Sequence, residues 1–157
     1  MPAFRTSRNV EISTLQFLET QLEAAWDNLE VVKSFNQAYD KNVNPPIVAV
    51  YLERTNDKRR EIGSTALSPT YAIAIDVFAT SDGQRIDLAD FIVDKLKDGW
   101  VYNSYAHQSG SPQTLVATAD GRISVISFDN NSPIRFGGNV EAKDRFRHSI
   151  QATVRKS

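Results

Sequence analysis

The clearest pattern in the sequence is a strict alternation of side chains that is followed at once by a helical spacing. In residues 70–79, every second position from Tyr71 to Val77 is large and apolar, and the positions between them carry two alanines and Asp76. This period of two predicts a β-strand. The alanines predict that the second face of the strand packs closely against a helix.

Residues 84–98 place apolar side chains three and four positions apart, which predicts an amphipathic helix. Ser81 with Gln84 matches a capping box at its start, and Gly99 is a typical helix stop. Residues 13–29 show the same spacing, and Ser13 with Gln16 would cap them. Residues 1–12 are interpreted as a short N-terminal arm.

The remaining segments predict further strands and loops. Residues 47–52 are an almost continuous apolar run that predicts a buried strand, and residues 145–155 alternate as in a half-exposed antiparallel strand. The turn pair Asp120-Gly121 predicts a hairpin. The other expectations are a short extended piece and a loop in 30–44, a charged loop at 54–61, an irregular edge at 100–107, hairpin strands at 114–119 and 122–128, and a loop at 129–139.

Together these elements predict one α+β domain over residues 1–157. Its sheet is expected to be mostly antiparallel and flanked by the helices at 13–29 and 84–98. No internal repeat or low-complexity segment divides the chain.

Composition narrows the function. Lys and Arg total 18 against 19 Asp and Glu, so the net charge of -1 gives no general attraction to nucleic acid or to an anionic membrane. The absence of cysteine excludes disulfides, thiolate metal sites and cysteine nucleophiles. The apolar runs are far shorter than the about 20 residues that span a bilayer, and the N-terminus does not resemble a signal peptide. We therefore expect a soluble, unprocessed protein.

The residues offer little catalytic chemistry. The sequence has two histidines, His107 and His148, far apart in the chain, and it lacks the motifs of zinc proteases, α/β-hydrolases and P-loop proteins. His148 falls on the apolar face of the last strand, which favours a hydrogen-bonded, partly buried histidine.

Asp76 is the most suggestive carboxylate, because it lies between Ile75 and Val77 in the middle of a strand, where a buried charge needs a partner. One interpretation joins it to Glu53 or Glu61 in the Mg²⁺ site of a small metal-dependent nuclease. The other pairs it with a neighbouring subunit or with an arginine such as Arg147.

Two charged surfaces are candidates for contacts with other proteins. Their residues are Arg54, Lys58, Arg59 and Arg60 in the charged loop, and Glu19, Glu23 and Asp27, spaced four residues apart, on the first helix. The loop also carries acidic residues, and such mixed charge suits a protein partner or a channel lining better than non-specific DNA binding. The acidic ridge is either solvated or meets a basic surface on another subunit.

The order of these elements resembles the tail terminator and neck (head–tail joining) proteins of long-tailed bacteriophages. The resemblance is one of layout and pattern from residue 13 to residue 154. It follows the helix at 13–29, the strand from Pro45-Pro46, the charged loop up to Gly63, the strand at 71–79, the helix at 88–96 and the strand at 148–154.

This resemblance implies a non-enzymatic virion protein without catalytic residues, cofactor or metal. Members form hexameric rings that cap the tail tube and offer a surface to the head connector or stopper protein, and DNA passes through the lumen without sequence-specific binding. It implies a place in the virion tail or neck after assembly in the host cytoplasm, with no membrane partner. The alternative is a head-completion or connector protein of the same junction. An ordinary cellular interaction domain is a further possibility.

Overall fold

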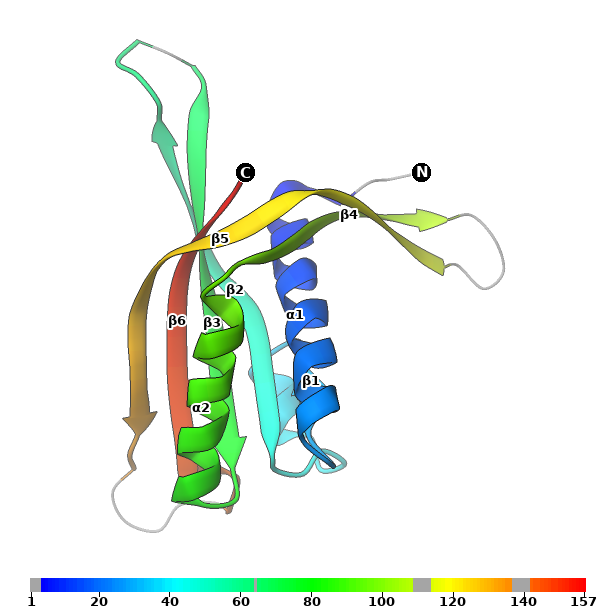
Figure 1. Cartoon of the computed structure of the whole chain (residues 1–157), viewed down its shortest axis with the longest axis vertical. Coiled ribbons are helices and arrows are strands. Elements are labelled where there is room, and N and C mark those ends of the chain that lie inside the picture. Colours follow the sequence, from blue (N-terminus) through cyan, green and yellow to red (C-terminus); the bar gives the residue numbers. More distant parts are fainter. Residues whose placement is uncertain (1–3, 64, 109–113, 137–141) are drawn as a thin grey trace.

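Six strands form one sheet in the order β1-β2-β3-β6-β5-β4, and two α-helices lie against one of its faces (Figure 1). The structure, a computed structural model, describes residues 4–63, 65–108, 114–136 and 142–157. The pair β1 and β2 is parallel and the other pairs are antiparallel, so the expected α+β domain with a mostly antiparallel sheet is confirmed. The elements are α1 Thr6–Ala25, β1 Glu30–Val32, η1 Asn36–Tyr39, β2 Ile47–Arg59, β3 Leu67–Ala79, α2 Asp82–Leu96, β4 Trp100–Gln108, β5 Thr114–Ile134, η2 Ala142–Asp144 and β6 Phe146–Lys156.

The predicted strand in residues 70–79 and the predicted helix at 84–98 are both present, and they form the centre of the molecule. β3 pairs with β2 on one side and β6 on the other, and α2 packs over it. The Ser81 hydroxyl accepts the Gln84 N–H at 3.1 Å, which starts α2. Gly99 follows the helix at a φ of +77°, which suits a glycine after a helix end.

The expectation that the alanine face of β3 packs against a helix is wrong. Both helices cover the opposite face, where Tyr71, Ile73, Ile75 and Val77 join the main core. The short 3-10 helices η1 and η2 pack on the alanine side. Ala74 pairs with Tyr51, whose hydroxyl reaches Asp76 on the same face, so a small side chain there leaves room for the tyrosine.

The first helix starts earlier than predicted. α1 runs from Thr6 to Ala25, so residues 6–12 form its first turns and the expected N-terminal arm is wrong over that stretch. Ser13 does not cap the helix, because it lies buried within it. The helix also ends before Asp27, which therefore stands in the turn that follows.

Buried and half-buried polar side chains along α1 cover two strand edges. They accept backbone N–H groups from β4 and β2: Asn9 from Tyr105 at 3.2 Å, Ser13 from Asn103 at 3.0 Å, and Glu11 from Leu52 at 2.7 Å. Because β2 and β4 lie toward opposite sides of the sheet order, the sheet curls around α1. The helix thus satisfies edge groups that would otherwise be open to pairing with another chain.

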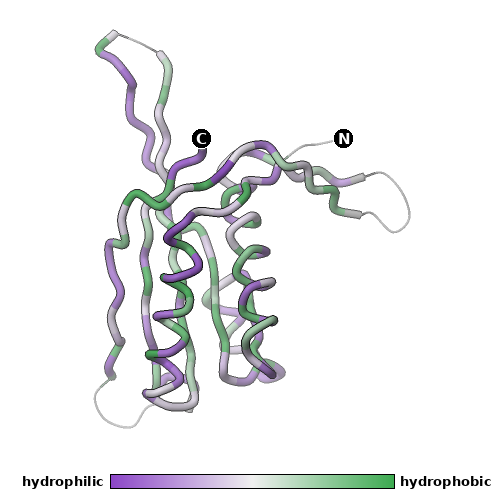
Figure 2. Tube along the Cα trace, in the orientation of Figure 1, coloured by the Kyte–Doolittle hydropathy of each residue, from purple (hydrophilic) through white to green (hydrophobic). Residues whose placement is uncertain are grey.

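The charged segment at 54–61 is a strand over most of its length, and not the predicted loop. β2 continues to Arg59 and pairs with β3 as far as Leu67, so the two strands extend past the helices as a ribbon at the top of Figure 1. Backbone pairing tolerates charged side chains here because they point into solvent on both faces. Figure 2 shows this outer part of β2 as a hydrophilic stretch.

The predicted hairpin at Asp120-Gly121 is also wrong. β5 is one continuous strand from Thr114 to Ile134, which includes the residues expected in a loop at 129–133. Gly121 lies at the register shift in the β4–β5 pairing, two residues before Ile123, which pairs with both β4 and β6, and its φ is +110°. β4 is an edge strand, as expected for this segment, and the loop expected at 137–139 lies outside the described residues.

Candidate functional site: a buried polar network and two charged surfaces

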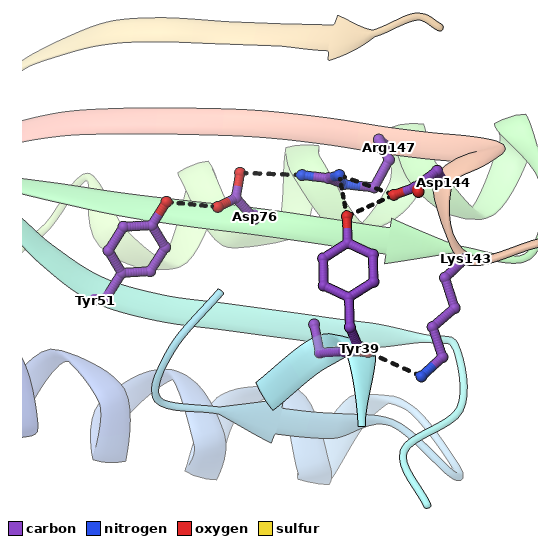
Figure 3. A network of polar contacts seen from close by, with 7 residues as sticks. Tyr39, Tyr51, Asp76, Lys143, Asp144 and Arg147 are labelled. Carbon is purple, nitrogen blue, oxygen red and sulfur yellow. Dashed lines mark hydrogen bonds and ion pairs between the residues drawn. The ribbon is translucent and has the colours of Figure 1, made fainter. Parts of the chain in front are cut away.

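A network of buried and half-buried polar side chains lies on the sheet face opposite the two α-helices (Figure 3). Arg147 on β6 is its centre: Nη2 is 3.6 Å from Asp76 Oδ1, and Nη1 donates to Asp144 Oδ1 and Tyr39 Oη at 3.2 and 3.1 Å. Tyr51 donates to the other Asp76 oxygen at 2.8 Å. The sequence-based interpretation that pairs Asp76 with Arg147 is therefore confirmed.

The network fixes the protonation of its members. Burial raises the pKa of Asp76, while Tyr51 and Arg147 act in the opposite direction. Burial and the bond to Asp144 raise the pKa of Tyr39 to about 12, and burial and the bond to Asp76 raise the pKa of Tyr51. Both phenols therefore remain hydrogen-bond donors at neutral pH. Their hydroxyl groups donate to carboxylate oxygens of Asp144 and Asp76, and so occupy lone pairs that would otherwise be open to a metal ion.

Two short helices are tied to the sheet through this network. Lys143 donates to the carbonyl oxygens of Ala38 and Asp40 at 3.0 and 2.6 Å, which joins η2 to η1. Arg147 also lies over the ring of Phe78, with its guanidinium carbon 4.0 Å from the ring centre. Over the described part of the chain, no group of three His, Asp or Glu side chains is arranged to hold a metal ion.

His148 is hydrogen-bonded and buried, as the sequence predicts. Arg85 Nη1 lies 2.7 Å from His148 Nδ1, and Asn131 Oδ1 lies 2.5 Å from Nε2. A guanidinium can only donate, so Nδ1 is the acceptor and Nε2 carries the proton. Burial and the Arg85 charge lower the pKa of His148, which favours this neutral form.

The four basic residues predicted as an interaction surface are all exposed. Lys58, Arg59 and Arg60 line a concavity of about 980 Å³ beside the β2–β3 ribbon, and Arg54 does not line it. Arg155 and Lys156, from the end of β6, line the same concavity, although no pattern in the sequence groups them with the other three. The antiparallel pairing of β3 with β6 brings them there, and the sequence alone does not reveal that pairing.

The acidic residues lie on a different part of the molecule. Glu19 and Glu23 are one turn apart near the end of α1, and Asp27 is exposed just beyond it. In Figure 1 that end of α1 is at the bottom, and the tip of the β2–β3 ribbon is at the top. The two surfaces therefore do not meet within one chain.

Large exposed apolar side chains accompany the two ribbons. Ile62, at the tip between β2 and β3, is fully exposed, and Leu67 at the start of β3 is half exposed. Leu115 and Val116, on the ribbon of β4 and β5, are also exposed. Apolar side chains gathered on projecting elements are typical of surfaces that contact another protein.

Comparisons with known proteins leave the family open, because the sequence matches no model of a protein family and no curated protein. No helix of the described chain is long and apolar enough to cross a membrane.

Proposed function

We propose that this chain is a structural protein of the head–tail junction of a long-tailed bacteriophage, and specifically the tail terminator. In this role it caps the tail tube as a hexameric ring and provides the surface that joins the head. The proposal begins from the resemblance in the order of elements between residues 13 and 154. It assigns the chain no reaction, cofactor or metal.

The observation that carries the proposal is the placement of opposite charges at opposite ends of one subunit. A closed ring requires two different patches that fit each other between neighbouring copies. The ends that carry Glu23 and Arg59 are separated along the long axis of the molecule (Figure 1), so each is available to a neighbour. A head-to-tail contact of this kind repeats from copy to copy, and it forms a closed ring when the rotation between neighbours closes.

The ribbons support the same proposal. An isolated two-stranded ribbon is marginally stable in water. The outer part of β2 and β3 extends past both helices, and it ends near the exposed side chains of Ile62 and Leu67. A neighbouring subunit or ring would cover these apolar groups and stabilise the ribbon.

The proposed partners follow from the proposed position. They are further copies of the chain, the tail tube protein on one side, and the head connector or stopper protein on the other. DNA passes through the lumen without being read, which suits a chain with a net charge of -1. The proposed location is the virion tail or neck, after assembly in the host cytoplasm.

A head-completion or connector protein of the same junction is the second candidate. The second ribbon, formed by β4 and β5, projects on the other side of α1 (Figure 1) and offers a further contact surface. The Mg²⁺-dependent nuclease is a remote alternative, because both oxygens of Asp76 already face donors of the protein itself.

The molar mass in solution, measured by light scattering over a range of concentrations, tests the proposal. We expect a species of about six times the 17.6 kDa chain mass. A stable monomer at every concentration, or cleavage of plasmid DNA that depends on Mg²⁺ and on Asp76, would contradict it. In the phage genome, a gene directly before that of the major tail protein would favour the terminator over the connector.

A further inference from the structure

The concavity beside the β2–β3 ribbon is a cationic hollow, formed by Lys58, Arg59, Arg60, Arg155 and Lys156. No acidic side chain lines it among the described residues. Lys156 lies 3.9 Å from Asp120, and the other four cations form no ion pair with any described residue. Unpaired cations around one hollow create a positive potential that favours an anionic partner.

The apolar side chains near the hollow indicate that this partner is a protein. Ile62 is fully exposed and Leu67 is half exposed, and both are close in sequence to the cations at the end of β2. A nucleic acid backbone would satisfy the charges and leave these side chains in water. A protein surface satisfies the charges and also buries the apolar groups.

The C-terminal end of α1 has the complementary character. Glu23 lies in the last turn, at the negative end of the helix dipole, and Glu19 lies one turn earlier; no basic residue occupies the last turn. Acidic side chains in this place are unfavourable for the isolated helix, and cations supplied from outside would remove that cost. Ala24 and Ala25 beside them are exposed and offer a small apolar surface.

The spacings of the two surfaces also agree. Glu19 and Glu23 are separated by four residues of helix, a rise of about 6 Å. Lys58 on β2 and Arg60 just beyond its end are two residues apart, or about 6.6 Å in an extended chain. Two carboxylates can therefore face two cations at once.

We propose that the cationic hollow receives the C-terminal end of α1 from a second copy of this chain. This inference rests on the proposed ring, and it names the residues that meet at each subunit contact. Glu19 and Glu23 of one copy face Lys58, Arg59 and Arg60 of the next, with Arg155 and Lys156 at the floor of the contact. Exposed alanines of α1 then lie against the apolar ribbon tip.

A charge swap between two variants tests the pairing. R59E/R60E lowers the net charge of the five lining side chains from +5 to +1 and places two carboxylates opposite Glu19 and Glu23. E19K/E23K instead places two cations opposite the cationic hollow. Each variant alone therefore loses the attraction between its own copies. We expect self-association of each to weaken by at least about tenfold, since close charge pairs across interfaces contribute strongly. An equimolar mixture should regain assembly, because alternating copies restore opposite charges at every contact. Analytical ultracentrifugation at low and high salt measures both effects.

The matched control is K41E/R135E, which reverses two exposed charges outside both surfaces and should assemble like the unmodified chain. Circular dichroism of every variant checks folding, and E23K/D27K carries the same test if E19K/E23K does not fold.

The outcomes separate this inference from the proposed function. The pairing is wrong, and the proposed ring is unaffected, if the unmodified chain and both variants all form rings. The same holds if the unmodified chain forms rings and the equimolar mixture of variants fails to assemble. If the unmodified chain is a monomer at every concentration, both the proposed ring and the proposed pairing are contradicted. If R59E/R60E loses binding to duplex DNA while it still assembles, the hollow binds nucleic acid and the inference is overturned.

Discussion

Arg147 and Asp76 face each other on adjacent strands, with Arg147 Nη2 3.6 Å from Asp76 Oδ1, and both side chains are buried. The guanidinium also binds Asp144 and Tyr39, so one side chain joins β6 and β3 to the short helices η2 and η1. Burying such a pair carries a large desolvation cost. Removing one member therefore destabilises the fold, because it leaves the other charge buried without a partner.

We therefore predict that Arg147→Ala lowers the free energy of unfolding by about 3–5 kcal/mol, because Asp76 and Asp144 lose their shared cation. Urea unfolding followed by tryptophan fluorescence measures the change. The control is Arg145→Ala, two residues earlier and exposed, which should stay within about 0.5 kcal/mol of the unmodified chain. Equal effects at the two positions would show that the buried network does not hold the domain together.

A second prediction concerns pH and His148. Its pKa in the folded chain is below the ordinary value of 6.5, because burial and Arg85 oppose its protonation. Between that lowered pKa and 6.5 the unfolded chain binds more protons than the folded chain, so stability falls as the pH falls below 6.5. The stabilisation by neutral His148 is fully present above 6.5.

We expect His148→Gln to reduce the loss of unfolding free energy on going from neutral to mildly acidic pH. Urea titrations at the two pH values, with and without the substitution, measure this difference. His107→Gln, which removes the other histidine of the sequence, is the control. A His148→Gln variant with an unchanged slope would contradict the assignment of the titration to this side chain.

A third prediction tests the role of α1 at the strand edges. Ser13→Ala removes the acceptor of the Asn103 N–H and leaves that amide without its partner beneath the helix. We expect a loss of about 1–3 kcal/mol in the free energy of unfolding. Thr20→Ala on the same helix is the control, because its hydroxyl is exposed and bonds only the helix backbone. The prediction fails if the two substitutions cost the same.

These edge contacts also explain which parts of the fold the sequence could predict. β3 and α2 have strong periods of their own and clear start and stop signals, so they were recovered. The early part of α1 was missed because Asn9, Ser13 and Thr14 are polar and yet buried. Their partners lie on distant strands, and a pattern within the helix carries no information about them.

The charged surfaces show the same limit. The sequence identifies Lys58, Arg59 and Arg60 as a basic group, because they are adjacent in the chain. It does not place Arg155 and Lys156 beside them, since that follows from the pairing of β3 with β6. Arg147 falls on the polar side of an alternating strand, which predicts exposure, but η1 and η2 cover that end of the sheet and bury it.

The last prediction concerns Gly121, which resembles the second residue of a hairpin turn in the sequence and has a different role in the structure. A Cβ atom added there would clash with the Ser157 carbonyl oxygen. The φ of +110° also opposes any residue that carries a side chain. We expect Gly121→Ala to destabilise the chain by more than about 1 kcal/mol. Gly83→Ala is the matched control, because Gly83 lies in the first turn of α2 with open space around it and should gain about 0.4–1 kcal/mol. Thermal unfolding of both variants measures these changes in stability. If Gly121→Ala left the stability unchanged, β5 would be able to bend without the glycine.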